Sequence, residues 1–138
     1  MSENPLIPKG GHTSKKIEKF EDFIAWQKAR HLSRKIYQAT NLPGCARDFG
    51  LKDQIRRAAI SIMSNIAEGF ERGRAAEFHQ FLWIAKAFCA ELRSQLYVAF
   101  DANYLSHAKV HELMSTAMEV GQVIGGLRVA VEKRKALA

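Results

Sequence analysis

Cysteine is scarce in this sequence of 138 residues, which contains only two: Cys45 in a predicted turn and Cys89 within a helical pattern. Neither belongs to a Cys-x-x-Cys motif or a Cys/His cluster, so we expect neither a disulfide framework nor a zinc site. Long apolar runs are also lacking, since none approaches the roughly 20 residues that span a bilayer, and the N-terminal lysines precede no signal-peptide core. These absences predict a cytoplasmic protein in a reducing compartment.

Recognisable catalytic motifs are lacking too. A di-metal carboxylate bundle needs Glu-x-x-His on two helices, and no glutamate here has a histidine three residues later. His107 and His111 are four residues apart, as in a two-histidine metal site, but no third ligand accompanies them. No Gly-Lys-Ser/Thr follows Gly69 and Gly73, which excludes a Walker phosphate loop. The sequence therefore predicts no enzyme, no cofactor and no metal site.

Acidic residues are in short supply, with 14 against 21 lysines and arginines, which gives a net charge of +7 and a pI near 9.7. This excess favours anionic partners, of which nucleic acid is the commonest, although basicity that serves solubility alone is the alternative. The candidate phosphate-contacting residues are Arg30, Arg34, Lys35, Arg56, Arg57, Lys133 and Arg134. Without a helix-turn-helix, zinc-finger or RNA-recognition motif, we expect no specific reading of bases.

Hydrophobic periodicity is helical along nearly the whole chain. Residues 1–19 combine prolines, glycines and lysines and predict a flexible basic arm. The domain then spans 20–135, with amphipathic helices expected at about 22–41, 48–69, 74–102 and 107–134. Pro43 and Gly44 are expected to stop the first helix, Asn103 to end the third and Ser106 to cap the fourth. Short connections make neighbours antiparallel, so the predicted fold is an all-α, up-down four-helix bundle.

Two of the predicted helices carry more apolar surface than one core needs. The third has a core stripe of Phe78, Phe81, Ala85, Phe88, Leu92, Gln95 and Ala99. The candidate interface residues lie off the main stripes: Ile60, Met63 and Ala67 on the second helix, and Trp83, Ala90 and Tyr97 on the third. Outward apolar side chains at helical spacing predict contact with a second copy or another protein.

The run from Gln54 to Gly69, QIRRAAISIMSNIAEG, strongly resembles the signature of the four helix bundle protein family, which includes proteins encoded by intervening sequences in bacterial 23S rRNA genes. Shorter matching stretches are WQKA at 26–29, IY at 36–37, FGL at 49–51, EF at 77–78 and FLWIA at 81–85. Together they cover about residues 20–131. The resemblance implies a homopentamer of four-helix subunits, shaped like a barrel with a central channel.

A polar side of the second helix matches the motif of this family, and its members are Arg57, Ser61, Asn65, Glu68 and Arg72. The resemblance implies a hydrogen-bond network between helices or subunits, with no catalytic role. More distantly, the chain is similar to the accessory variability determinant of diversity-generating retroelements, a basic pentamer that binds nucleic acid and the reverse transcriptase. Function does not transfer by fold alone.

The leading hypothesis is a non-enzymatic, homo-oligomeric and pentameric protein whose basic surface contacts RNA or DNA phosphates. The alternative is a protein-interaction adaptor, for example for a reverse transcriptase, which would bind Trp83, Ala90 and Tyr97 or the rim of the pentamer. A metal-dependent enzyme is the third hypothesis, and it lacks ligands beyond His107 and His111.

Overall fold

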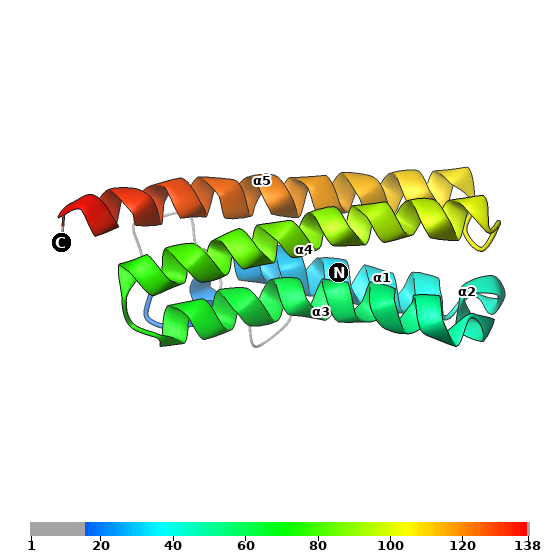
Figure 1. The fold of residues 1–138 in the computed structure, drawn as a ribbon, viewed down its shortest axis with the longest axis horizontal. Helices are drawn as coiled ribbons and strands as arrows, with labels where there is room; N and C mark the ends of the chain where they lie inside the picture. Colours follow the sequence, from blue (N-terminus) through cyan, green and yellow to red (C-terminus); the bar gives the residue numbers. More distant parts are fainter. Residues whose placement is uncertain (1–15, 138) are drawn as a thin grey trace.

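The computed structural model describes residues 16–137, with side chains up to Arg134, so most of the predicted N-terminal arm lies outside the described residues. Within that range the chain contains helices and no strands. The elements are a short 3-10 turn η1 (Phe20–Asp22), α1 (Ile24–Thr40), α2 (Pro43–Arg47), α3 (Phe49–Glu71), α4 (Ala75–Asp101) and α5 (His107–Leu137). The long helices α1, α3, α4 and α5 lie side by side, with α2 at one end (Figure 1).

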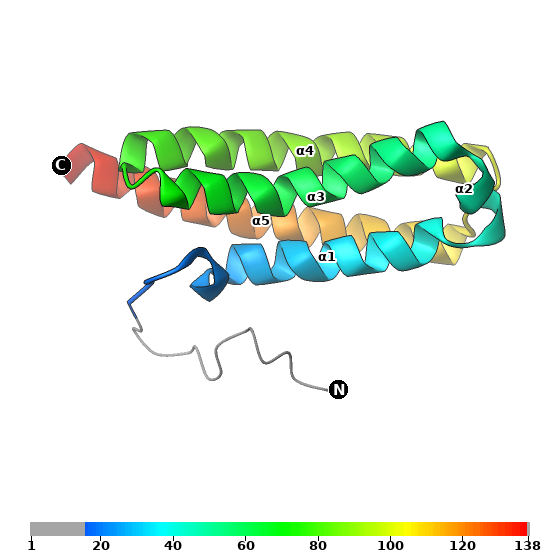
Figure 2. The ribbon, with the colours of Figure 1, turned by 90° about the horizontal axis from the view of Figure 1, so that it is seen from below.

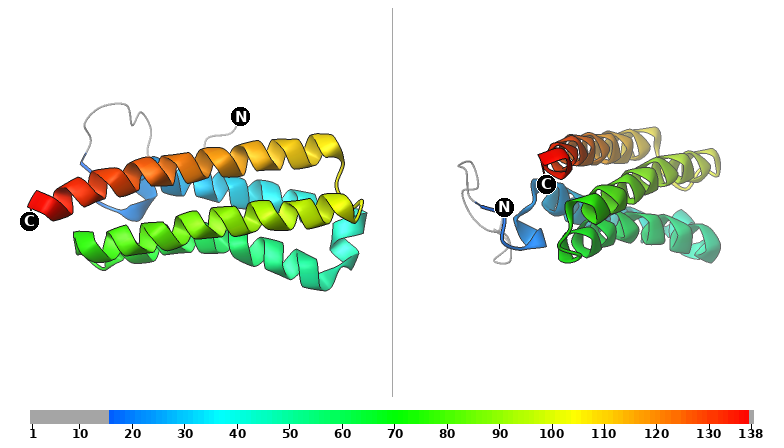
Figure 3. Two further views of the ribbon diagram at one scale, coloured as in Figure 1. Left: turned by 45° about the horizontal axis from the view of Figure 1, so that its top comes forward. Right: turned by 60° about the vertical axis from the view of Figure 1, so that its left-hand side comes forward.

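The four long helices enclose one core. Helix α1 packs against α3 and α5, and α4 packs against the same two helices, so that each helix has two neighbours (Figure 2; Figure 3, right). The largest fully buried side chains come from all four: Leu32, Ile36, Ile55, Ile62, Ile66, Leu82, Leu92, Leu96, Leu113 and Ile124. The predicted all-α class and four-helix arrangement are therefore confirmed.

The connection between α1 and α3 differs from the expected turn. Pro43 and Gly44 begin the short helix α2, where proline at the first position loses no needed N–H donor. Cys45 lies on this helix and is buried in the core at 1% exposure. Gly44 is in close contact with the α4–α5 loop, because a Cβ added there would lie 3.1 Å from the Tyr104 Cα. The expected turn is thus an ordered helical corner.

Asp48 stabilises the corner at α2, because each of its carboxylate oxygens accepts a hydrogen bond. Its Oδ1 accepts a hydrogen bond from the backbone N–H of Leu51 at 3.1 Å and so caps α3. Its Oδ2 accepts one from the Tyr104 hydroxyl at 3.0 Å, which raises the pKa of Tyr104 above its ordinary value because the neutral phenol is the donor. One side chain therefore joins the start of α3 to the α4–α5 loop.

The α4–α5 loop has the caps that its sequence predicts. Asn103 adopts a left-handed conformation with φ of 62°, and the N–H of Tyr104 donates to the carbonyl of Ala99 at 2.9 Å, as in a Schellman motif. The Ser106 hydroxyl accepts from the N–H of Lys109 at 3.1 Å and caps α5.

The core stripe of α4 is a correction to the predicted one. Phe81 and Phe88 are only half-buried, whereas Leu82, Cys89 and Leu96 are buried. The predicted and observed stripes share Phe78, Ala85, Leu92, Gln95 and Ala99. At the remaining positions they differ in whether the step of three or of four comes first. Because α4 contacts both α3 and α5, its buried face is wide. Residues of both series are therefore at least half-buried.

Gly69 permits the close approach of α3 to α4. A Cβ at this position would lie 2.5 Å from the Cβ of Phe81 and 3.0 Å from the Cδ1 of Phe78. Around this point Phe23, Phe70 and Phe78 pack ring against ring, with centroids 5.1 to 5.8 Å apart. The close packing of α3 against α4 therefore requires a glycine at position 69.

We predict that Gly69→Ala lowers the free energy of unfolding by about 1–3 kcal/mol, because the new methyl group forces α3 and α4 apart. Gly126→Ala is the matched control, since a Cβ there meets nothing within 4 Å, and it should raise stability by about 0.5–1 kcal/mol. Urea unfolding followed by circular dichroism measures both. A Gly69→Ala protein as stable as the Gly126→Ala protein would contradict the packing argument.

Candidate nucleic-acid interface

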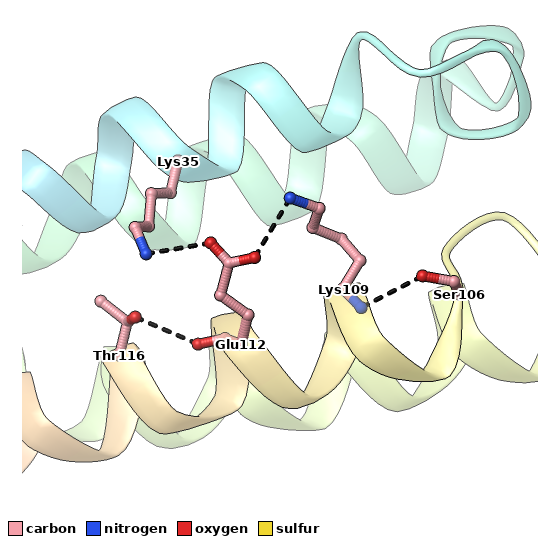
Figure 4. A network of polar contacts seen from close by, with 5 residues as sticks. All are labelled: Lys35, Ser106, Lys109, Glu112 and Thr116. Carbon is pink, nitrogen blue, oxygen red and sulfur yellow. Dashed lines mark hydrogen bonds and ion pairs between the residues drawn. The ribbon is translucent and has the colours of Figure 1, made fainter.

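Lys35, one of the predicted phosphate-contacting residues, is held in an ion-pair network between α1 and α5 (Figure 4). Its Nζ lies 3.0 Å from Glu112 Oε1, and Lys109 Nζ lies 3.1 Å from Glu112 Oε2. Hydrogen bonds from these two lysines hold the pKa of Glu112 below its ordinary value. Two turns away along both helices, Lys28 pairs with Glu119. The positive charge of Lys35 is therefore partly neutralised by Glu112 at the surface between α1 and α5.

Arg56 is likewise engaged within the fold. Its Nε donates to Thr40 Oγ1 at 2.8 Å and its Nη2 to Asn41 Oδ1 at 2.9 Å. The guanidinium also lies over the Tyr37 ring, 4.3 Å from the centroid. These contacts fasten the end of α1 to α3. The adjacent Arg57 is exposed and has no ion pair among the described residues.

The other predicted cations are divided between two regions. Arg34 is exposed on α1 without an ion pair in the described part, whereas Arg30 is half-buried with its guanidinium 5.8 Å from the Trp26 ring centroid. Lys133 and Arg134 are exposed near the end of α5, which extends beyond its neighbours in Figure 1. The predicted set is therefore not one continuous patch.

The polar motif of α3 makes few contacts between helices. Asn65 Nδ2 donates to the Ser61 carbonyl at 2.7 Å, within α3 itself. Arg72 reaches α4, where it lies 4.0 Å from Glu77 and 5.3 Å from the centroid of the Phe81 ring. Glu68 and Arg57 are exposed and unpaired within residues 16–134. These two residues are available to a partner.

The apolar strip on α3 is less exposed than its pattern indicates. Ile60 has 40% of its surface exposed, but Met63 and Ala67 are half-buried against the core. The Met63 sulfur lies 3.5 Å from the Ser33 hydroxyl, so this side chain faces α1. Ala67 borders a shallow depression together with Glu68, Glu71 and Arg72. Ile60 is the main apolar contact that this strip offers to solvent.

Trp83 and Tyr97 lie where α4 meets α5 and are 51% and 63% exposed. Two hollows of about 370 and 300 Å³ adjoin there, and Arg93 and Met118 line both. We call this surface the α4–α5 groove and define it by Trp83, Lys86, Ala90, Arg93, Tyr97 and Met118. The three residues predicted as an outward stripe thus border a groove rather than a flat surface.

The groove is basic. No aspartate or glutamate lines either hollow, and Lys86 and Arg93 are exposed without ion pairs in the described residues. At one end the Arg128 guanidinium lies 4.2 Å from the centroid of the Trp83 ring. Sequence reasoning missed Lys86 and Arg93, although their spacing of seven residues is that of Trp83, Ala90 and Tyr97. That shared heptad spacing is the signal that could have found them.

Among the described residues no group of three or more histidine, cysteine, aspartate or glutamate side chains could hold a metal ion. The rings of His107 and His111 are stacked with centroids 6.4 Å apart. Within residues 16–137 no helix is both long enough and apolar enough to cross a bilayer.

The contrast between the neighbouring arginines gives a prediction. Arg56→Ala should lower the free energy of unfolding by about 1–3 kcal/mol, because it removes charged hydrogen bonds to Thr40 and Asn41. Arg57→Ala should change it by less than about 0.5 kcal/mol, since this side chain is exposed. Chemical unfolding of both variants measures the difference. If the two variants are equally stable, the contacts of Arg56 do not stabilise the fold.

Comparison with solved structures finds the same fold in a protein of unknown function from the S23 ribosomal protein family of Bacteroides thetaiotaomicron. The TM-score is 0.70 at 20% identity, over 76% of this chain and 95% of that one. At this identity the likeness shows the fold alone. No curated protein matches the chain. The family model for the 23S rRNA-intervening sequence protein matches residues 21–126, which is most of the sequence. The chain therefore belongs to the 23S rRNA-intervening sequence protein family.

Proposed function

We propose that this protein is a non-enzymatic, basic homo-oligomer that binds RNA or DNA through contacts to phosphates. The supporting observation is a set of exposed cations that have no ion pair among the described residues: Arg34, Arg57, Lys86, Arg93, Lys133 and Arg134. Surface cations that are not neutralised by neighbouring carboxylates keep their attraction for a polyanion.

The mode of binding follows from the kind of contacts that are available. Phosphates carry no sequence information, so a surface of lysines and arginines orients a nucleic acid without reading its bases. Each phosphate that is neutralised releases condensed counterions, and affinity then falls steeply as salt rises. The proposed protein is accordingly a binder of broad sequence tolerance.

We predict that the protein binds nucleic acid at 50 mM salt and that the affinity falls about a hundredfold by 200 mM, as four phosphate contacts would require. Fluorescence anisotropy with labelled RNA and DNA, single-stranded and duplex, measures this. A protein with no affinity for any of these probes at 50 mM salt contradicts the proposal, whereas affinity that is insensitive to salt contradicts the phosphate contacts.

Self-association is the second part of the proposal. The exposed Ile60 on α3 offers an apolar contact outside the core of one bundle. The family resemblance implies five copies, and self-association would multiply the charge of +7 on each chain. Several weak sites on one assembly bind a long polyanion more tightly than one site does, because the later contacts become intramolecular.

We predict that light scattering gives a mass about five times the 15.5 kDa of one chain. Ile60→Glu should yield smaller species with unchanged helical content, since the charged side chain enters the proposed contact. Val98→Glu, at a position that is 53% exposed on α4, serves as the control and should leave the mass unchanged. A wild-type protein with the mass of a single chain would refute self-association.

An adaptor is the second candidate function. Phe49 is 71% exposed and lies with Leu42, 42% exposed, at the α2 end of the bundle. Apolar side chains that project from one end suit a protein partner better than a phosphate backbone. This candidate is favoured if no nucleic acid binds at low salt and a bound protein, such as a reverse transcriptase, is released by Phe49→Ser.

A further inference from the structure

We propose that the α4–α5 groove binds a segment of single-stranded nucleic acid, with bases stacked on Trp83 and Tyr97 and phosphates at Lys86 and Arg93. This inference rests on the proposed function and assigns its ligand class and its site. Single-strand binding sites combine a basic groove with aromatic side chains on which successive bases stack. The α4–α5 groove has both parts.

The aromatic part consists of two rings on one edge of α4. Trp83 and Tyr97 expose 51% and 63% of their surfaces, which is far more than a core residue exposes. They are fourteen residues apart, so they are separated by about 21 Å along the helix. This length suits roughly four nucleotides, which is the shortest site size of single-strand binding folds.

The floor between the rings is made of small side chains. Ala90 lies midway on α4, and Gly121 of α5 lines the same hollow. A Cβ added at Gly121 would meet only the Cys89 Cβ, at 3.8 Å, so that packing within one chain does not require this glycine. The absence of a side chain there keeps the groove open beside the rings. Gly121 itself is buried, and the missing side chain leaves room in the hollow for a flat group such as a base.

The charges of the groove favour a polyanion over a second copy of the chain. Lys86 and Arg93 have no carboxylate beside them, and none lines the two hollows. A second copy carries the same net charge of +7, so its approach to this basic surface is opposed by repulsion. A nucleic acid carries the opposite charge, and it has one planar base for each phosphate.

Arg128 prepares Trp83 for stacking. Its guanidinium lies over the ring at 4.2 Å from the centroid, while half of the tryptophan surface stays exposed. His79 Nε2 on α4 lies 3.3 Å from Arg128 Nη1, and the same nitrogen lies 3.0 Å from Glu132 Oε2, so the guanidinium is in contact with α4. A base that stacks on the exposed part of the ring adds to an existing cation–π pair. A duplex cannot do so because its bases are already stacked.

Intrinsic fluorescence tests the stacking directly, because the chain has two tryptophans and Trp26 is buried in the core. Titration of the wild-type protein with a 12-nucleotide oligo(dT) or oligo(U) at 50 mM salt should quench the emission. Trp83→Phe should abolish the quenching, and Trp83→Ala with Tyr97→Ala should weaken binding about tenfold per ring. A poly-glutamate peptide that competes as well as the oligonucleotide, or binding of oligonucleotide without quenching, would overturn the proposal.

A charge-reversal pair locates the site. Lys86→Glu with Arg93→Glu should weaken oligonucleotide binding at least about a hundredfold and abolish the quenching of Trp83. Arg47→Glu with Arg74→Glu changes the net charge equally at two exposed positions outside the groove and outside the proposed phosphate-binding set, and it should retain saturable quenching. Light scattering measures the mass of every variant and so shows whether the groove substitutions change the oligomeric state.

Each outcome of this comparison has one meaning. If the Lys86→Glu, Arg93→Glu protein binds the oligonucleotide as tightly as the Arg47→Glu, Arg74→Glu protein does, the groove is not the site, while the proposed function stands. A wild-type protein that binds neither single strands nor duplexes removes the proposed function and the groove together. Loss of mass in the Lys86→Glu, Arg93→Glu protein assigns the groove to self-association and overturns the proposal.

Discussion

The close contact of α3 and α4 at Gly69 sets the geometry on which the rest of the surface depends. Phe78 and Phe81 lie against the bare backbone of this glycine, and that contact fixes the rotation of α4 about its own axis. With Phe81 directed toward α3, Trp83 is turned about 200° around the helix and emerges beside α5. A packing requirement between two helices thus decides which side chains border the groove with a third.

Sequence periodicity predicts the class of fold and most of the core, but not the rotation of each helix. In α4, the series through Phe81 and the series through Leu82 both alternate steps of three and four. The choice between them depends on α3 and α5, which are distant in sequence. The corner at α2 was missed for a similar reason. Pro43 and Gly44 favour a turn locally, whereas burial of Cys45 and the Tyr104 contact stabilise a helix there.

The sequence also fails to predict which charged side chains of the candidate site are free to bind a ligand. Residue type predicts that a lysine or arginine is charged, but its availability depends on carboxylates and carbonyls brought near by folding. Lys35 on α1 pairs with Glu112 on α5, 77 residues later, and Arg56 on α3 donates to Asn41, the residue that follows α1. Lys86 and Arg93 find no such partner among the described residues, and apart from the heptad spacing that they share with Trp83 and Tyr97, nothing in their local sequence distinguishes them from other surface cations. The structure therefore corrects the predicted list of unpaired cations more than it corrects the predicted fold.

Basicity and self-association oppose each other in the proposed assembly. Copies that each carry a charge of +7 repel one another, and salt weakens this repulsion because exposed charges beyond about 10 Å are screened. The same salt weakens contacts with phosphates. A bound nucleic acid resolves the conflict, since it neutralises cations on neighbouring copies while it occupies their grooves. By linkage, a ligand that binds the assembled state more tightly stabilises that state by the same differential affinity. The proposed nucleic acid is thus both a ligand of the assembly and a cause of its stability at low salt.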